Sequence, residues 1–346
     1  MKTQYWSVDK YVDNIRNYPQ ISQAASLLKQ NEVIAFPTET VYGLGGNAES
    51  DEAVQKIFEA KGRPSDNPLI IHIAEIKQLN QFAENIPDHA KILMETFWPG
   101  PLTLVLNKRA GFLSEKATAG LSTVAVRMPD HPVALAVIKE SGLPIAAPSA
   151  NRSGKPSPTT AKHVADDLHG RIAGIVDGGP TGVGVESTVL DCTEPVPVIL
   201  RPGGITKEQI EKVIGPVKID PALDDAGQAP KSPGMKYRHY APNAPLYLVD
   251  GSREYIQKLI TENEAKGLKA GVLTTEESKG LYNAHLVLSC GNRSNLDTVA
   301  SSLYDTLRKF NESDVDIIFS EMFPEEGVGQ AIMNRLLKAA GHRVLS

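Results

Sequence analysis

The sequence predicts a mixed α/β protein that is divided into two domains, and three observations support this prediction. The chain has 346 residues, a length that favours two domains over one. From about residue 20, helix-period segments alternate with short apolar runs rich in β-branched residues, which is typical of α/β domains. The predicted strands of the first two thirds follow one another closely, which favours a mixed sheet over a regular doubly wound one.

The first domain is expected over residues 1–220. Its helices are predicted at residues 21–30 and 51–61, and its strands at 33–36, 69–73, 102–106, 123–126, 144–147, 174–176, 188–190 and 198–200. The second helix has well-marked ends, because Ser50 suits its amino-terminal cap and Gly62 suits its carboxyl-terminal end. An apolar stripe between these two residues predicts that the helix packs on one face.

A break in composition separates the second domain from the first. Residues 221–245 contain five prolines and two glycines without a periodic pattern, so we expect a linker or lid there. Residues 246–346 are typical of a smaller repeating β/α domain, with strands at 246–249, 270–273, 284–288 and 315–319 and helices at 253–268, 296–310 and 329–340. We identify no catalytic motif in this second domain.

The net charge of −5 argues against a protein that grips nucleic acid over a broad surface. Three segments nevertheless lack Asp and Glu, namely residues 116–129, 141–165 and 226–249. Such segments suit an anionic ligand, although merely polar loops are the alternative. The first residues lack the apolar run of a signal peptide, and no stretch approaches the roughly 20 apolar residues that span a bilayer, so we expect a cytoplasmic protein without a membrane segment.

Several common kinds of site are missing from the sequence. Cys192 and Cys290 are the two cysteines, and neither has a Cys or His at metal-ligand spacing. We therefore expect no disulfide framework and no zinc site, and we predict that both cysteines are buried. Neither a GxxxxGK(S/T) loop nor a GxGxxG turn occurs, so a nucleotide site here must be of a less common kind.

The segment PTETVYGL, residues 37–44, directly follows a buried predicted strand. The hydroxyls of Thr38, Thr40 and Tyr42 are therefore expected at a strand's carboxyl end, where α/β sheets often bind ligands. The alternative is a capping turn, in which Thr38 or Thr40 starts a helix.

The segment KGRPSDN, residues 61–67, offers two positive charges and an amide within one proline-containing turn. Lys61, Arg63 and Asn67 would suit a polyphosphate, and the alternative is that both cations complement a helix carboxyl terminus. His72 lies within LIIHIA, where a lone histidine is more often a satisfied core residue than a ligand.

Later strands carry further polar candidates. Thr123 and Arg127 share one face of a predicted strand, and a buried arginine there needs an anionic partner, either a ligand carboxylate or a structural Asp or Glu. Further donors lie at strand ends or in the acid-free loop after them, namely Ser149, Asn151, Ser157, Ser187 and Arg201. Ordinary turn chemistry is the alternative for each of them.

The linker sequence is unusual, because a spacer needs only Gly, Ser or Pro. Here Lys236, Tyr237, Arg238, His239 and Tyr240 stand in a row. Such a linker suits a fold over a site, with its tyrosines stacked on a base and its cations beside phosphates. The alternative is that it holds the two domains together.

Seven of these segments are PTETVYGL, KGRPSDNPL, TVAVRMPDHP, PSANRSGKPSPT, VESTV, LRPGG and SPGMKYRHYAP. Together they resemble the YrdC-like threonylcarbamoyl-AMP synthases in their long, two-domain form, over nearly the whole chain. The resemblance implies a first domain with a twisted, open mixed sheet around a positive cavity, and a smaller Rossmann-like second domain.

The resemblance also implies an activity. L-threonine, bicarbonate or CO2, and ATP would give threonylcarbamoyl-AMP and pyrophosphate, a nucleotidyltransferase reaction that serves N6-threonylcarbamoylation of the adenosine next to the anticodon in tRNA. The implied threonine-binding residues are Thr40, His72, Arg127, Ala147 and Ser187. The implied ATP-binding residues are Lys61, Arg63, Asn67, Thr123, Ser149, Asn151, Ser157 and Arg201, with Tyr237 or Tyr240 closing over the nucleotide. Lys61 and Arg63 are the implied catalytic residues.

The implied cofactor is Mg²⁺, held mainly by phosphates and water without a cage of protein ligands. The implied partners are the downstream tRNA threonylcarbamoyl-transferase proteins, and a weak contact with RNA is a further expectation. Two alternatives stay open. One is a non-catalytic module that binds double-stranded RNA or tRNA, and the other is carbamoyl-adenylate chemistry with a different acceptor.

Overall fold

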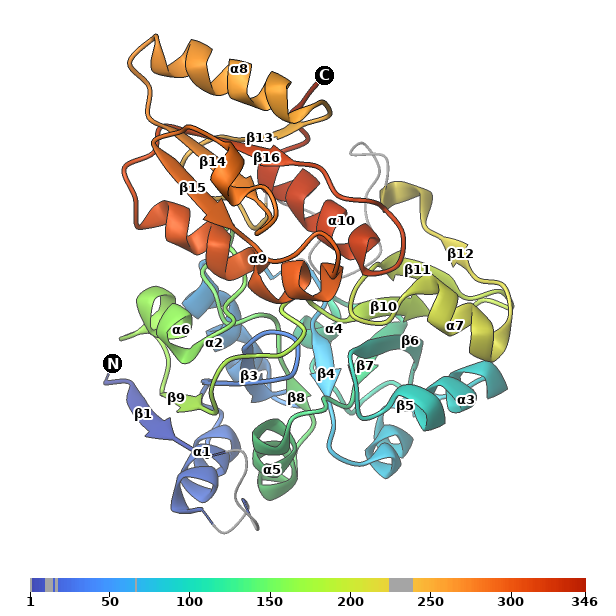
Figure 1. Ribbon diagram of the computed structural model, residues 1–346. Helices are drawn as coiled ribbons and strands as arrows, with labels where there is room; N and C mark the ends of the chain where they lie inside the picture. The colour runs from blue at the N-terminus through green and yellow to red at the C-terminus, as the bar shows by residue number, and fades with distance from the viewer. Residues whose placement is uncertain (1, 10–14, 16–17, 66, 224–238) are drawn as a thin grey trace. The chain divides into compact units, whose positions relative to one another are not determined.

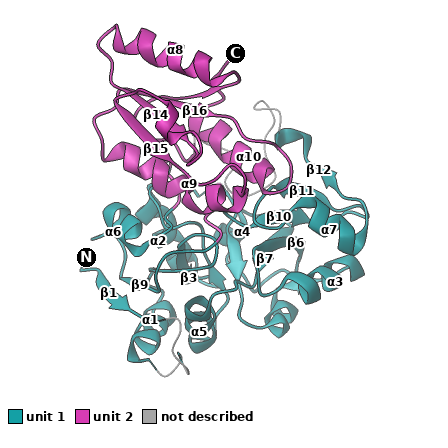
Figure 2. Cartoon of the chain, in the orientation of Figure 1, with its two compact units in different colours: residues 1–153, 158–182, 186–236 teal, residues 154–157, 183–185, 237–346 magenta. Residues whose placement is uncertain are grey.

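The computed structural model describes residues 2–9, 15, 18–65, 67–223 and 239–346. The chain divides into two compact units (Figure 2). Unit 1 comprises residues 1–153, 158–182 and 186–236, and unit 2 comprises residues 154–157, 183–185 and 237–346. Most of the expected linker at 221–245, including Lys236, Tyr237 and Arg238, lies outside the described residues. The division into two domains and a separate lid at these boundaries therefore stays a prediction.

Unit 1 is built on a mixed β-sheet, which has twelve strands in the described part of the chain (Figure 1). They are β1 (Gln4–Ser7), β2 (Ile34–Phe36), β3 (Gly43–Asn47), β4 (Ile70–His72), β5 (Ala83–Glu84), β6 (Leu102–Lys108), β7 (Thr123–Arg127), β8 (Ile145–Ala146), β9 (Gly174–Asp177), β10 (Thr188–Asp191), β11 (Val198–Arg201) and β12 (Lys218–Ile219). The order is β1-β9-β2-β3-β8-β4-β7-β6-β10-β11-β12, and β5 pairs with β6. Because β4 and β7 are parallel while β6 and β7 are antiparallel, the predicted mixed sheet is confirmed.

The helices of unit 1 include both that the sequence predicts. They are α1 (Pro19–Lys29), α2 (Asp51–Lys61), α3 (Asp88–Phe97), α4 (Glu115–Thr118), α5 (Pro132–Ser141), α6 (Ala161–Leu168) and α7 (Lys207–Ile214), with the 3₁₀ helices η2 (Ile76–Gln81) and η3 (Pro221–Leu223). The ends of α2 are as expected. The Ser50 hydroxyl accepts from the backbone N–H of Ala53 at 3.2 Å, and Gly62 ends the helix with a left-handed φ of 64°.

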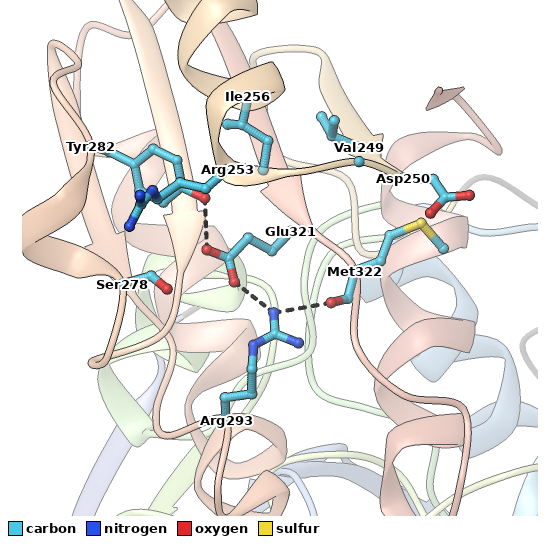
Figure 3. A pocket seen from close by; sticks show the side chains of 10 residues that line it. Val249, Asp250, Arg253, Ile256, Ser278, Tyr282, Arg293, Glu321 and Met322 are labelled. Carbon is cyan, nitrogen blue, oxygen red and sulfur yellow. Dashed lines mark hydrogen bonds and ion pairs between the residues drawn. The ribbon is translucent and has the colours of Figure 1, made fainter.

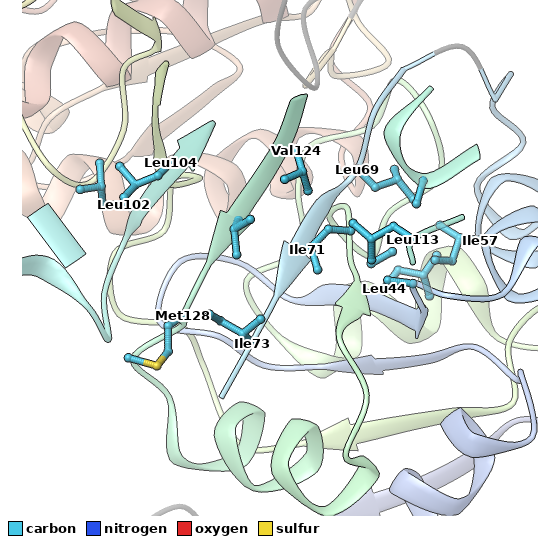
Figure 4. Close-up of a cluster of buried hydrophobic side chains, with 14 of the residues drawn as sticks. Leu44, Ile57, Leu69, Ile71, Ile73, Leu102, Leu104, Leu113, Val124 and Met128 are labelled. Atoms are coloured by element: carbon cyan, nitrogen blue, oxygen red, sulfur yellow. The ribbon is translucent and has the colours of Figure 1, made fainter. Parts of the chain in front are cut away.

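A large apolar cluster packs helices onto the sheet of unit 1 (Figure 4). Leu44 of β3, Ile57 of α2, Ile71 of β4 and Leu104 of β6 are all fully buried in it. Burying each such side chain contributes about 1.5–3 kcal/mol to folding. The cluster thereby holds the strands whose ends carry the polar candidates. Cys192 belongs to this cluster and is buried and free, as the sequence predicts.

The strand β3 was not predicted, because three of its five residues are glycine and give no apolar pattern. The structure explains one of these glycines. A Cβ at Gly45 would lie 2.5 Å from the Phe36 ring and 2.8 Å from Ile145 Cγ2. The close approach of β2 and β8 to this strand therefore needs a residue without a side chain.

Unit 2 is a smaller α/β unit with a parallel sheet in the order β15-β14-β16-β13-β17, as the strand and helix pattern predicts. Its strands are β13 (Leu246–Val249), β14 (Ala270–Thr274), β15 (Leu286–Ser289), β16 (Ile317–Glu321) and β17 (Val344–Leu345). Its helices are α8 (Arg253–Glu264), η4 (Lys279–Leu281), α9 (Leu296–Asn311) and α10 (Val328–Ala340). Cys290 is fully buried here and free. Among all described residues, no helix has the length and apolar character that a membrane span requires.

Candidate active site

Arg127, the last residue of β7, is the centre of a buried polar cluster in unit 1. Its side chain is 4% exposed, and its Nη2 lies 2.6 Å from Glu39 Oε1. Arg127 Nη1 donates to Thr40 Oγ1 at 2.8 Å, and Nε donates to the Gly100 carbonyl at 3.2 Å. Of the two partners that the sequence left open, the structure thus contains the structural carboxylate. The guanidinium is held on three sides, so its orientation is fixed before any ligand binds.

The turn between β2 and β3 presents Glu39 and Thr40 to Arg127. Thr38 Oγ1 donates to the Val41 carbonyl at 2.7 Å and accepts from the backbone N–H groups of Thr40 and Val41. The Tyr42 hydroxyl donates to the Gly179 carbonyl at 2.7 Å. No helix starts here, so the capping alternative for Thr38 and Thr40 is wrong. The two threonines close a turn between two strands.

His72, the last residue of β4, is paired with Arg127 of the neighbouring parallel strand. Burial and, to a smaller extent, the adjacent Arg127 charge together lower the pKa of His72 to about 3. The imidazole is therefore neutral at pH 7, and it supplies one donor and one acceptor instead of a charge. Its Nδ1 lies 3.2 Å from the Ile70 carbonyl. His72 is a buried histidine, as expected for a core residue, yet it adjoins the Arg127 cluster.

Lys61, at the end of α2, reaches the loop that follows β8. Its Nζ donates to the carbonyls of Ser149 and Asn151, the second at 2.8 Å, and lies 3.4 Å from Asn151 Oδ1. The Ser149 hydroxyl donates to the same Oδ1 at 2.6 Å. Lys61 is 4% exposed, so its ammonium braces this loop from inside the fold. Lys61 lies in the last turn of α2, where a cation complements the helix carboxyl end, and it also makes these contacts with a distant loop.

The loop that follows β8, which contains Ser149 and Asn151, lies against the turn between β2 and β3, which contains Thr38. Gly43 and Ser149 form an isolated antiparallel bridge, and the Ala150 N–H donates to the Tyr42 carbonyl at 2.8 Å. Ala147, which is 4% exposed, precedes this loop and donates its N–H to the Ile70 carbonyl at 2.9 Å. These backbone bonds bring the segments 37–43 and 147–151 together, although they are about 100 residues apart in the chain.

Arg201 and Ser187 form a second cluster at β10 and β11. Arg201 donates to the Ser187 carbonyl from Nε at 3.1 Å and from Nη2 at 2.9 Å, and Nη2 reaches the Ser187 hydroxyl at 3.2 Å. That hydroxyl lies 2.7 Å from Thr103 Oγ1 of β6. The Thr188 N–H donates to the Pro101 carbonyl, one residue beyond the Gly100 that binds Arg127. Adjacent carbonyls thus link the two clusters.

The remaining candidates are placed less closely together. Thr123 is the first residue of β7, four residues before Arg127 and on the same face, as predicted. Arg63 and Asn67 lie in the loop after α2, where Asn67 is buried and Arg63 is half-buried. Ser157 and Tyr240 belong to unit 2, and Tyr237 lies outside the described residues. Tyr240 is 5% exposed and stacks on Tyr304 with ring centroids 5.1 Å apart.

Two residues of these clusters were missed from the sequence, Glu39 and Thr103. Glu39 lies within PTETVYGL, and it is the acidic partner that a buried arginine requires, so the need for a counter-charge was its signal. Thr103 lies in an apolar strand and gave no signal of its own.

The site brings fixed cations and neutral hydrogen-bonding groups onto one region of the mixed sheet. Such an arrangement suits the alignment of anions without a covalent step on the protein. Within the described ranges, no group of three or more His, Cys, Asp or Glu side chains is placed to hold a metal ion.

The chain is similar to known proteins over its whole length. Residues 26–203 match the family model Sua5_yciO_yrdC, described as telomere recombination, and residues 205–341 match the model for the C-terminal domain of threonylcarbamoyl-AMP synthase. A threonylcarbamoyl-AMP synthase from Bacillus subtilis (strain 168) is 64% identical over 345 residues, which cover 100% of each chain. One from Pyrococcus abyssi is 51% identical and covers 94% of this chain and 95% of its own.

Solved structures agree with these matches. The crystal structure of P. abyssi Sua5 complexed with L-threonine superposes on this fold with a TM-score of 0.91 and 48% identity, and it covers 99% of both chains. At this identity and coverage, the likeness extends to both units and to the segments that carry the two clusters.

Proposed function

The chain belongs to the threonylcarbamoyl-AMP synthase family, and from that premise we propose how its residues carry out the reaction. Unit 1 joins L-threonine with bicarbonate or CO2 and activates the product with ATP. The products are threonylcarbamoyl-AMP and pyrophosphate. The first of these serves the N6-threonylcarbamoylation of the adenosine next to the anticodon in tRNA.

The threonine site is formed around Arg127. A solved relative of high identity is complexed with L-threonine, and the Arg127 cluster supplies a buried, oriented guanidinium that a carboxylate could use. Arg127 binds the threonine carboxylate, with Thr40 and Ser187 as hydroxyl partners and neutral His72 as a hydrogen-bonding wall. Ala147 closes the site with a small side chain. Glu39 keeps the Arg127 guanidinium in place by its contact at 2.6 Å.

The ATP site is formed around the loop that Lys61 braces. Arg63, Asn67, Ser149 and Asn151 face the phosphates in this proposal, together with Thr123, Ser157 and Arg201. Lys61 acts both as a positive charge and as the support of Ser149 and Asn151, because it donates to both of their carbonyls. Tyr237 or Tyr240 closes over the nucleotide.

The reaction then needs no protein nucleophile. The threonine amine attacks the carbon of CO2, loses a proton, and becomes a carbamate. A carbamate oxygen attacks the α-phosphorus of ATP, and the bond to the β-phosphate oxygen breaks as pyrophosphate leaves. Two anions must approach each other, so the positive charges of Lys61, Arg63 and Arg127 offset their repulsion. Mg²⁺ enters with ATP as part of the substrate, and its phosphate-bound charge eases the departure of pyrophosphate.

The single observation that carries this proposal is the fixed Arg127 cluster. The test is mass spectrometry of the products after incubation with L-threonine, bicarbonate and MgATP, with pyrophosphate assayed in parallel. We expect a threonylcarbamoyl-adenylate mass and pyrophosphate that depends on threonine. Omitting threonine is the first control. Arg127→Met is the second, and it should abolish both products while ATP still binds.

The same assay separates the two alternatives. Pyrophosphate release with an amino acid other than threonine would favour a different acceptor. Salt-sensitive RNA binding without ATP turnover would favour the RNA-binding module. We propose in addition that the product passes to tRNA threonylcarbamoyl-transferase proteins in the cytoplasm, with at most weak contact between this chain and RNA.

A further inference from the structure

A polar cavity lies within unit 2, and none of the residues that line it takes part in the proposed reaction. It has a volume of about 340 Å³ and lies at the carboxyl ends of β13 and β16, beside the loops that follow β14 and β15 (Figure 3). The carboxyl ends of parallel strands are where open α/β sheets bind ligands, and this volume lies in the usual range of small-molecule sites.

Glu321 is the anchor of the cavity floor. Its Oε1 accepts from the Thr274 hydroxyl at 2.6 Å and from the Tyr282 hydroxyl at 2.8 Å. Its Oε2 accepts from Arg293 Nη2 at 2.6 Å. Its negative charge is therefore offset within the protein, and the floor does not repel an anionic ligand as an isolated carboxylate would.

Arg293 is fixed by the same contacts, yet it keeps binding capacity. Its bonds to Glu321 and to the Met322 carbonyl, at 2.6 and 3.1 Å, both use Nη2. Its guanidinium also lies over the Phe323 ring, 5.0 Å from the centroid. Nη1 takes part in neither hydrogen bond, and the side chain is 40% exposed. A held guanidinium with a remaining donor is preorganised for a phosphate or carboxylate oxygen.

The cavity has two chemically different ends. Arg253 and Ser278 lie on the side of Tyr282, and Asp250 lies on the opposite side, with Glu321 and Arg293 between them (Figure 3). Arg253 pairs with Glu254, which is 73% exposed and therefore a weak competitor for a ligand. Val249, Ile256 and Met322 add apolar wall. One end thus suits an anion, and the other suits a donor such as a sugar hydroxyl or an exocyclic amine.

We propose that this cavity binds a nucleoside monophosphate. The phosphate lies between Arg253, Ser278 and Arg293, Asp250 accepts from the donor groups at the far end of the nucleoside, and the apolar wall contacts the base. Inorganic phosphate alone would leave the Asp250 end and the apolar wall unused. All of the residues that line the cavity belong to unit 2, and none of them is a residue of the proposed reaction.

The test follows the methyl group of Met322 by ¹³C NMR in the full-length protein, with AMP as the probe. Met322 lines the cavity, whereas Met128 of unit 1 serves as an internal reference for binding elsewhere. We expect a saturable shift of the Met322 signal with AMP. Arg253→Gln should raise the half-saturating concentration about tenfold, because it removes one charge-assisted contact. Ser278→Trp, which fills the cavity, should abolish the shift.

Matched controls make the outcome decisive. Lys258→Gln removes one positive charge from the same helix at a residue that pairs with Glu262, and it should bind AMP as the wild type does. Lys61→Met should leave the Met322 response unchanged. The proposal is overturned if AMP leaves Met322 unmoved, if Arg253→Gln and Lys258→Gln behave alike, or if phosphate alone binds as tightly as AMP. Loss of the response in Lys61→Met would also overturn it.

Discussion

Both units place an arginine beside a glutamate, but the two pairs differ in burial. Arg127 and Glu39 expose 4% and 13% of their side chains, whereas Arg293 and Glu321 expose 40% and 11%. A buried charge that loses its partner remains in a low-dielectric interior, while an exposed one is solvated by water. Arg127 therefore depends on its partners inside the fold, whereas Arg293 keeps an exposed side that can bind a ligand.

The two sheets explain how each pair arises. In the mixed sheet of unit 1, the turn between the antiparallel strands β2 and β3 brings Thr40 to Arg127, the last residue of β7. In the parallel sheet of unit 2, the carboxyl ends of the strands lie at the same edge, so the loops that follow the strands line the cavity. The comparison predicts that substitutions in unit 1 cost more stability than equivalent substitutions in unit 2.

The largest effect is expected for Arg127→Met. It leaves Glu39 without its ion pair at 2.6 Å, so the free energy of unfolding should fall by about 3–5 kcal/mol. Urea unfolding followed by circular dichroism measures this. The double variant Arg127→Met with Glu39→Gln should recover most of the stability and none of the activity. A loss below about 1 kcal/mol, the size typical of a surface pair, would break the comparison.

Lys61→Met should mainly reduce activity. Without the ammonium, the carbonyls of Ser149 and Asn151 lose a shared donor, and the loop moves. A displacement of about 1 Å at a reacting site can cost about a hundredfold in rate, so kcat/KM for MgATP should fall by that order. Lys56→Met on the same helix, which loses surface pairs with Glu32 and Glu52, is the control and should retain near-normal kcat/KM.

His72 should make the stability of the protein depend on pH. Its folded-state pKa is about 3, and its unfolded pKa is about 6.5. Below pH 6.5 the unfolded chain binds a proton that the folded chain does not, so stability is complete above that pH and falls as the pH falls toward 3. Between pH 7 and pH 5, the wild type should lose about 2 kcal/mol more than His72→Gln. If urea titrations show equal losses in the free energy of unfolding for the two proteins, the pKa of His72 is not lowered and its imidazole is hydrated.

The smallest effect is expected for Glu321→Gln in unit 2. The amide oxygen keeps an acceptor for the hydroxyls of Thr274 and Tyr282, whereas the amide NH2 replaces the oxygen that accepts from half-exposed Arg293, so that ion pair is lost. The free energy of unfolding should fall by about 1 kcal/mol, as for a hydrogen-bonded pair near the surface. A loss as large as that of Arg127→Met would remove the distinction between the two units. Differential scanning calorimetry of both variants makes this comparison directly.

Much of the fold was predictable from local pattern. The ends of α2 follow from Ser50 and Gly62, and β13 was predicted with the bounds that the structure has. The helices α3 to α7 and the strands β1, β3, β5, β12 and β17 were not predicted, β3 because its glycines carry no pattern. Glycine at residue 45 is required by the Phe36 ring, a contact that only the folded chain contains.

By itself, the sequence predicted the candidate residues for the chemistry and many of the segments that form strands and helices. Turn residues, apolar periodicity and charge are properties of neighbours in the chain, so they can be read locally. The tertiary structure alone decided which candidates meet. It paired Arg127 with Glu39, set Lys61 beneath the Ser149 loop, and buried His72 beside Arg127 so that it is neutral. Those outcomes depend on the strand order of a mixed sheet and on burial, which arise from contacts between residues far apart in the chain.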